Sequence, residues 1–266
     1  MKPPRFRAVG ATSALKEEII ARALAAGFDD VGFAAARLLD DDLRRLEEWL
    51  ADDRHGEMEW LARDPRRRAE PTSWVKSVIV FARAYAPLEW NQVERRYAAY
   101  AEGGDYHRDL KSRLDSIAQF IRDRGGRAKR FVDTSAILER AWAREAGIGF
   151  IGRNTMLISR THGPNMYLAE IFTDMELEPD ESGTGTCGRC TRCLDICPTS
   201  ALDEKGLDAR KCISYLTIEL KRTMTEEEKA MTGPWDFGCD DCVTICPYTR
   251  RGLPPIRPGG RGVTRR

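Results

Sequence analysis

Eight cysteines are concentrated in one stretch of this 266-residue chain, between positions 187 and 246. The first 186 residues contain no cysteine. The run Cys187-x2-Cys190-x2-Cys193-x3-Cys197-Pro198 has the spacing typical of iron–sulfur cubanes, in which three closely spaced thiolates ligate one cluster and the fourth reaches another. The chemistry that this spacing indicates is the transfer of single electrons.

A second run, Cys239-x2-Cys242-x3-Cys246-Pro247, ends in the same way but has Asp236 where a first cysteine would stand. Cys212 is the only thiol outside the two runs. Counting four ligands per cubane predicts two complete [4Fe-4S] clusters, as in bacterial ferredoxins. One would be held by Cys187, Cys190, Cys193 and Cys246, and the other by Cys197, Cys212, Cys239 and Cys242.

Zinc sites and disulfides are two other uses of paired cysteines. A pair of zinc sites would also use eight cysteines, but the spacing with a terminal Cys-Pro is typical of cubanes. Disulfides belong mostly to short secreted chains. Met1 to Arg5 is not followed by an apolar core, so we expect no secretion signal.

Few other motifs stand out. The segment Gly147-Ile148-Gly149-Phe150-Ile151-Gly152 fits the dinucleotide pattern G-x-G-x-x-G, but it follows a predicted helix and precedes a predicted strand, the reverse of the required order. The histidines, His55, His107 and His162, are too scattered to form a metal triad. Each is interpreted as a surface or hydrogen-bonding residue.

Composition bounds the class of protein. With 42% hydrophobic and 32% charged residues, the chain is expected to be globular rather than disordered. The formal net charge is +1, so contact with nucleic acid must come from local basic patches. The longest β-rich apolar stretch, residues 78–82, is far too short to span a bilayer, and we expect no membrane contact.

Hydrophobic periodicity predicts the elements that position these residues. Helices are predicted over 13–26, 40–53, 105–124 and 136–146, and strands over 77–85, 129–133, 155–159 and 165–174. The acidic stretch 176–186 is the best candidate boundary. We therefore expect an α+β protein with an α/β-type domain around a central sheet (1–178), a ferredoxin-like domain with two [4Fe-4S] clusters (179–250) and a basic, flexible tail (251–266).

Several segments together resemble the epoxyqueuosine reductases. They are Val132-Asp133-Thr134-Ser135-Ala136-Ile137-Leu138-Glu139-Arg140-Ala141, the glycine-rich segment from Gly147 to Thr155, His55-Gly56-Glu57-Met58, Asp105-Tyr106-His107 and the cysteine half. The resemblance covers about residues 13 to 249. It implies that the first domain binds cobalamin and that the chain is an oxidoreductase, which reduces the epoxide of epoxyqueuosine at the tRNA wobble position to queuosine.

The resemblance assigns the role of the acid to Asp133, which would protonate the leaving oxygen. A carboxylic acid does this near neutral pH only if burial raises its pKa, and Asp133 follows the apolar pair Phe131-Val132 at a strand end. The residues alone leave an alternative open. Asp133 could instead cap a helix that begins near Ser135, because Asp-Thr-Ser is a favourable capping sequence.

The cobalamin site is the least readable part of the sequence. The D-x-H-x-x-G motif that supplies an axial histidine is absent, so the family implies cob(II)alamin bound base-off, without a histidine ligand to cobalt. The expected cofactor contacts come from both domains. They are Met58, Tyr97, Tyr106, Asp133, Asn154, Ser159, Ser214, Asp240 and Asp241.

The expected partners are a tRNA that carries epoxyqueuosine and a flavodoxin- or ferredoxin-like electron donor. Lys221 and Arg222 form one candidate phosphate-binding patch, residues 127–130 a second and the tail arginines a third. Longer family members continue into a helical-repeat extension, whereas this chain resembles a short form that lacks it. We expect a cytoplasmic monomer.

Two other functions stay open. A reductive dehalogenase-like enzyme would also combine cobalamin with two cubanes, but such proteins typically carry export signals. A ferredoxin-type electron carrier with a docking domain would need no cobalamin. Binding of cobalamin to the purified protein distinguishes the enzyme from the carrier.

Overall fold

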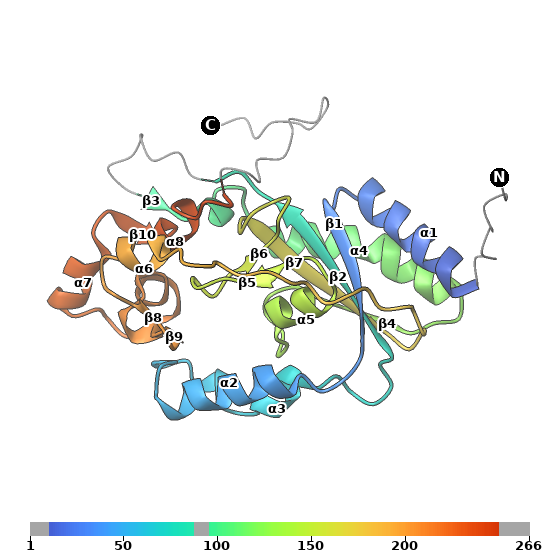
Figure 1. The fold of residues 1–266 in the computed structure, drawn as a ribbon, viewed down its shortest axis with the longest axis horizontal. Coiled ribbons are helices and arrows are strands. Elements are labelled where there is room, and N and C mark those ends of the chain that lie inside the picture. Colours follow the sequence, from blue (N-terminus) through green and yellow to red (C-terminus); the bar gives the residue numbers. More distant parts are fainter. Residues whose placement is uncertain (1–10, 88–95, 250–266) are drawn as a thin grey trace.

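The computed structural model describes residues 11–87 and 96–249, which form a sheet part and a cysteine part (Figure 1). The sheet part is built on four strands in the order β1-β2-β7-β4. These strands are β1 (Asp30–Ala35), β2 (Ser77–Ala84), β7 (Met166–Thr173) and β4 (Ala128–Phe131). All three pairings are antiparallel, which agrees with the predicted α+β class.

Helices cover both faces of this sheet (Figure 1). Ile79 and Phe81 of β2 belong to the apolar core beneath two of them, whereas Val78 and Val80 belong to the core on the other face. Both faces are therefore dry, and a charged side chain inside either core is an exception. The helices are α1 (Ala11–Ala25) and α4 (Tyr106–Asp123) on the first face, and α5 (Glu139–Glu145), α2 (Asp40–Ala51) and α3 (Pro65–Ala69) on the second.

The cysteine part consists of short elements joined by loops that carry the thiols. They are α6 (Arg192–Ile196), β8 (Leu202–Asp203), β9 (Gly206–Leu207), η3 (Ala209–Lys211), the π-helical η4 (Tyr215–Glu219), α7 (Glu226–Thr232), β10 (Trp235–Phe237) and α8 (Asp241–Thr244). The remaining elements are η1 (Glu59–Leu61), β3 (Arg96–Tyr97), η2 (Ala99–Ala101), β5 (Phe150–Ile151) and β6 (Leu157–Ile158).

The predicted helices and strands lie where the periodicity places them, with shorter ends. The strand predicted over 129–133 ends at Phe131, and the helix predicted over 136–146 begins only at Glu139. The glycine-rich segment 147–152 follows α5 and precedes β6, as expected, but it also contains the short strand β5, which was not predicted. β1 was not predicted, because its alternation of apolar residues extends over only six residues. The predicted tail, residues 251–266, lies outside the described residues.

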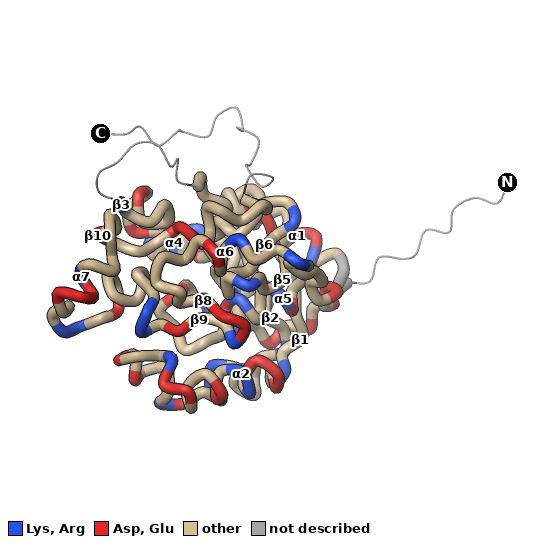
Figure 2. The backbone as a smooth tube through the Cα atoms, turned by 60° about the vertical axis from the view of Figure 1, so that its left-hand side comes forward, with Lys and Arg blue, Asp and Glu red and all other residues tan. Residues whose placement is uncertain are grey.

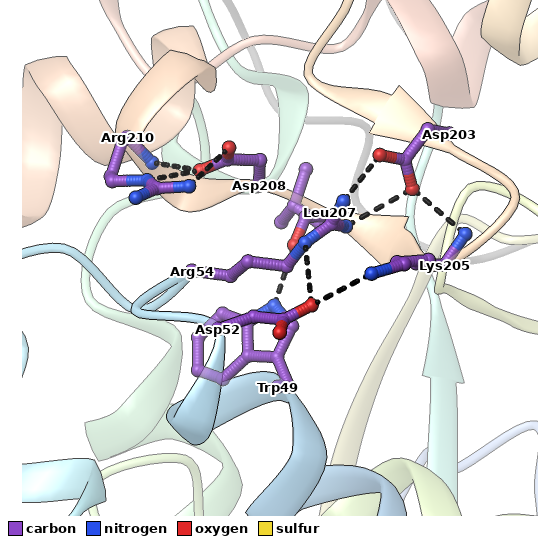
Figure 3. Close-up of polar contacts among 8 residues, drawn as sticks. All are labelled: Trp49, Asp52, Arg54, Asp203, Lys205, Leu207, Asp208 and Arg210. Carbon is purple, nitrogen blue, oxygen red and sulfur yellow. Dashed lines mark hydrogen bonds and ion pairs between the residues drawn. The ribbon is translucent and has the colours of Figure 1, made fainter.

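The two parts are connected by strand pairing and by polar contacts. β3 pairs in parallel with β10. At the end of α2, Arg54 forms a two-pronged ion pair with Asp203, and the Trp49 indole donates to the Leu207 carbonyl at 2.5 Å (Figure 3). These contacts hold the β8–β9 hairpin against the C-terminal end of α2.

Charges of both signs are interleaved along the chain, for example on α2 and α7 (Figure 2). This distribution agrees with the small net charge. Within residues 11–87 and 96–249, no helix combines the length and the apolarity that crossing a membrane requires.

Gly32 allows α5 to approach β1 closely, which gives a first prediction. A Cβ at this position would lie 1.9 Å from the Ala146 carbonyl oxygen. We expect Gly32→Ala to destabilise the fold by about 1–3 kcal/mol, because the helix must move away. Thermal unfolding followed by circular dichroism measures the change. Gly103→Ala is the matched control, since a Cβ at Gly103 has no neighbour within 4 Å; equal melting of the two variants would contradict the prediction.

Candidate active site

Asp133 lies two residues beyond β4, in a tight turn that leads to α5. Its φ of 51° is left-handed, a conformation that aspartate tolerates better than most non-glycine residues. The N–H groups of Thr134 and Ser135 close the turn on the carbonyls of Val132 and Asp133. The capping alternative is therefore wrong, because α5 begins at Glu139 and its N-cap residue is Leu138, not Asp133.

The Asp133 carboxylate contacts His107. Its Oδ2 lies 2.9 Å from Nε2 of the imidazole, and the imidazole Nδ1 lies 3.0 Å from Oδ1 of Asp105. The ring thus bridges two carboxylates and is placed to pass a proton between them. The Asp133 side chain is 53% exposed, so the expected burial of this carboxyl is wrong.

The sequence predicted His107 to be a surface or hydrogen-bonding residue and assigned it no role in the site; the structure confirms the hydrogen bonding and adds the contact with Asp133. The signal that would have found it is its position in the first turn of α4, directly after Asp105. Asp105 is the N-cap, and its carboxylate accepts the backbone N–H of His107. That cap orients the first turn, and only the fold brings the turn beside Asp133.

Two further carboxyl groups lie behind Asp133. Glu139, the first residue of α5, accepts the backbone N–H of Asp133 at 2.5 Å. Glu170 of β7 is fully buried and contacts the Glu139 side chain. Burial, followed by the charge of Asp133, raises the pKa of Glu139, and burial, followed by the charge of Glu139, raises that of Glu170 well above its usual range.

A row of aromatic side chains connects Asp133 with the cysteine part. Its successive ring centroids are 4.0 Å apart for His107–Tyr106, 6.0 Å for Tyr106–Tyr100, 6.3 Å for Tyr100–Phe237 and 6.5 Å for Phe237–Tyr97. Tyr97, at the far end, is 53% exposed. An accessible aromatic wall with a carboxylate at one end fits a flat macrocyclic cofactor and a proton donor beside it.

Residues of both parts converge on Tyr100 in the middle of this row. Burial, then the charges of Asp240 and Asp133, raise the pKa of Tyr100 to about 12. Asp240 neighbours a cysteine of the second predicted ligand set. Asp133 and Asp240 therefore both lie within electrostatic range of Tyr100.

All eight cysteines are free thiols, and they fall into two electrostatic groups. Burial raises the pKa of the Cys193 and Cys242 thiols, and nearby thiols raise each further. For Cys193 these are Cys187, Cys246 and Cys190; for Cys242 they are Cys239, Cys212, Cys197 and, last, Cys193. The grouping supports the two ligand sets derived from spacing.

The zinc alternative finds no support in this arrangement. In the part of the chain that the structure describes, no three His, Cys, Asp or Glu side chains lie close enough to hold a single metal ion. A cubane distributes its four thiolates over four irons, so its ligands stand farther apart than those of zinc.

Three of the expected cofactor contacts are engaged within the protein. Asn154 is 4% exposed and donates its amide to the Cys242 carbonyl at 3.2 Å. Ser159 is 2% exposed, and its hydroxyl accepts two backbone N–H groups of the following turn. Asp240 is 3% exposed and accepts the Ala99 N–H at 2.6 Å. In this structure their polar atoms hold the surroundings of the site together.

The other expected contacts lie nearer to accessible surface. Met58 packs against Tyr215 beside Cys212, and Ser214 begins η4 two residues after that cysteine. Tyr97 and Tyr106 belong to the aromatic row, whereas Asp241 lines a cavity of about 360 Å³ on the cysteine part. The structure thus places Tyr106 near Asp133 and Tyr97 at the far end of the aromatic row, and it leaves Asp241 at a separate cavity.

The expected tRNA-binding pair is less basic than its sequence indicates. Lys221 and Arg222 are both exposed. The Arg222 guanidinium, however, forms ion pairs with Glu57 at 2.8 Å and Glu228 at 2.6 Å. Its charge is largely compensated, which leaves Lys221 as the stronger candidate for a phosphate contact.

Comparison with known sequences gives two family matches. Residues 186–249 match the model described as "4Fe-4S double cluster binding domain". Residues 66–134 match the one described as "Epoxyqueuosine reductase QueG, DUF1730". An epoxyqueuosine reductase of Cellulophaga algicola is 38% identical over 250 residues, covering 90% of this chain and 81% of the relative.

Solved structures agree with these matches. An epoxyqueuosine reductase crystallised with an epoxyqueuosine-modified tRNA-Tyr stem loop has a TM-score of 0.83 at 33% identity, over 90% of this chain and 66% of that one. The Bacillus subtilis reductase, with a catalytic aspartate loop swung out of its active site, has a TM-score of 0.81 at 32% identity, over 90% and 66%.

A more distant structural neighbour shares only the fold. The reductive dehalogenase NpRdhA has a TM-score of 0.63 at 16% identity, and the match covers 91% of this chain but 33% of the dehalogenase. The likeness in sequence to the reductases is therefore much stronger than to the dehalogenase, which disfavours the dehalogenase alternative.

The cysteine groups give a second prediction. Cys212→Ala should lower the iron content from about eight to about four per chain, because one cubane loses a ligand. Iron analysis and electron paramagnetic resonance of the reduced protein measure the loss. Lys211→Ala changes an exposed neighbour and should retain all the iron. Full iron content in Cys212→Ala would remove Cys212 from the ligand set.

Proposed function

This chain belongs to the epoxyqueuosine reductase family, and we propose that it reduces the epoxide of epoxyqueuosine at the tRNA wobble position to queuosine. The observation that carries the proposal is the position of Asp133. Its accessible carboxylate contacts His107, the first ring of an aromatic row that leads to the cysteine part. The relative solved with a modified tRNA stem loop supports tRNA as the substrate.

The reaction sets clear demands on the site. Removal of the epoxide oxygen as water consumes two electrons and two protons. The clusters deliver electrons singly. Cobalamin, when bound, supplies a carbon-reactive metal centre that can collect these electrons. The protein must therefore supply protons, hold the cofactor and keep the clusters near it.

We propose that Asp133 donates a proton to the leaving oxygen and that His107, in place of the burial expected from the sequence, supplies that proton. The 2.9 Å contact between Oδ2 and Nε2 lets a proton pass directly. Asp105, on the other side of the imidazole, holds the ring in the orientation that directs Nε2 at Asp133. The aspartate-bearing catalytic loop named for the Bacillus subtilis relative supports this role.

The aromatic row is the proposed wall of the cofactor site. Tyr97 and Tyr106 would contact the ring, and Met58 and Ser214 would border it on the cysteine side. The second ligand set would lie nearer to the cofactor, because Asp240 and Ser214 adjoin its cysteines. The first set would then be the entry point for electrons.

For the electron donor we propose an acidic flavodoxin- or ferredoxin-like protein that docks beside the first ligand set. Arg153, Arg189 and Arg192 are exposed around Cys187 and Cys190, and Arg153 donates its backbone N–H to the Cys187 sulfur at 3.4 Å. Within the described residues none of the three arginines forms an ion pair. Acidic carriers are attracted to such a patch.

We also propose that the protein acts on tRNA as a cytoplasmic monomer.

The acid role of Asp133 gives the third prediction. Asp133→Asn should retain both clusters and cobalamin but lose about 10²–10⁴-fold in turnover, because the amide cannot donate the proton. Anaerobic assay of epoxyqueuosine-containing tRNA with reductant, read by mass spectrometry of the nucleoside, measures the loss. Asp41→Asn, on the exposed face of α2, is the control. Wild-type turnover in Asp133→Asn would exclude Asp133 as the acid.

The donor surface gives the fourth prediction. Replacing Arg189 and Arg192 with Glu should raise the KM for an acidic flavodoxin about tenfold at low salt, and added salt should reduce the difference. Turnover with dithionite, a small reductant, should not change. Replacing the exposed Arg45 and Arg63 with Glu makes the same change in net charge away from this surface and is the control. An unchanged KM for flavodoxin in the double variant would place the docking surface elsewhere.

A further inference from the structure

Glu170 is an exception in the apolar core beneath α5. It lies in the middle of β7, opposite Val80 of β2 and Phe131 of β4, and its exposed fraction is 0%. Neither carboxylate oxygen has a hydrogen-bond donor among the described residues. A buried carboxylate without a donor costs far more than a buried neutral acid. The group must therefore be retained in its protonated form.

The protonated Glu170 would donate a hydrogen bond to Glu139. Glu139 is the carboxyl group that Glu170 faces, and two carboxyl groups can form a hydrogen bond only if one of them holds a proton. Glu170 is the more deeply buried, and it is the group whose pKa lies well above its usual range. A neutral Glu170 therefore donates its O–H to the Glu139 carboxylate.

Glu139 in turn holds the turn that carries Asp133. Its Oε1 accepts the backbone N–H of Asp133, which has a left-handed φ of 51°. A non-glycine residue in that conformation is strained and needs support from its surroundings. The bond from Glu139 supplies such support at the residue whose carboxylate meets His107.

We infer that Glu139 is a positioning residue for Asp133 and that a protonated Glu170 holds Glu139 in place. The turn that carries Asp133 is thus held to β7, an inner strand of the sheet, through two carboxyl groups that share one proton. This inference rests on the proposed acid role of Asp133, but the fastening itself is measurable without turnover.

The charged surroundings determine the direction of the pH dependence. Glu170 faces Glu139 and, farther away, Asp133; Glu139 also faces Arg140 of its own helix. From α4 and η4, His107 and Glu219 face Asp133. Because the pKa of Glu170 is raised, its O–H is present at low and neutral pH. The bond to Glu139 is lost as the pH rises through the folded-state pKa of Glu170.

Amide hydrogen exchange tests the fastening directly in the cluster-loaded protein. In Glu170→Leu the Glu139 carboxylate loses its donor, so exchange over residues 132–138 should become faster. In Glu170→Gln the side-chain amide still donates, so exchange should stay near the wild-type rate. Thr173→Val removes another fully buried polar group of β7 and should leave exchange at 132–138 unchanged. Equal exchange in Glu170→Leu and wild type would overturn the inference.

Infrared spectroscopy and the pH profile test the proton. The wild type should show a protonated carboxyl band at neutral pH that disappears in Glu170→Gln and persists in Asp133→Asn. Glu170→Leu should lose about 10²-fold in turnover through misplacement of the acid. Glu170→Gln should retain turnover and extend it to higher pH. A band that survives in Glu170→Gln would contradict the inference.

The two proposals fail in different ways. Full turnover in Asp133→Asn would exclude Asp133 as the acid, yet exchange and infrared data would still decide whether Glu170 fastens the turn. Conversely, unchanged exchange in Glu170→Leu together with an inactive Asp133→Asn would leave the acid and remove the fastening.

Discussion

One buried hydrogen bond at the junction supports much of the arrangement around the site. The Asp240 carboxylate, 3% exposed, accepts the N–H of Ala99 and thereby ties the segment after β3 to the loop that carries Cys239. Burial raises the pKa of Asp240 to about 6, so the ionised form is held at a cost that the Ala99 N–H offsets in part. With β3 paired to β10, this bond places Tyr97 and Tyr100 between the acid and the thiols.

The carboxyl groups of the site differ in function because they differ in environment. Asp133 is accessible and contacts His107, which suits a group that must give and regain protons. Glu170 is sealed in the core and suits a group that keeps its proton. In the proposed function, the same side-chain chemistry serves proton transfer at the surface of the site and support behind it, because burial disfavours the charged form of a carboxyl.

The predictions from sequence succeeded where a local pattern carries the information. The cysteine spacing indicated two clusters, and the family match over residues 186–249 agrees with it. Periodicity located α4 and β7, whose apolar residues repeat with the helix and strand periods. It placed the start of α5 too early in the chain, because Asp-Thr-Ser is a favourable capping sequence. The tight turn at Asp133 overrides that local preference.

The sequence by itself determined the redox chemistry, since thiolate spacing is a local property that survives without knowledge of the fold. Resemblance added the acid at Asp133. Only the tertiary structure decided what surrounds that acid. His107, Glu139 and Glu170 belong to a helix start, a second helix start and a mid-strand position, and antiparallel pairing of β4 with β7 and packing of α4 and α5 on the sheet bring them together. Such a cluster has no period and no fixed spacing along the chain, so packing alone specifies it.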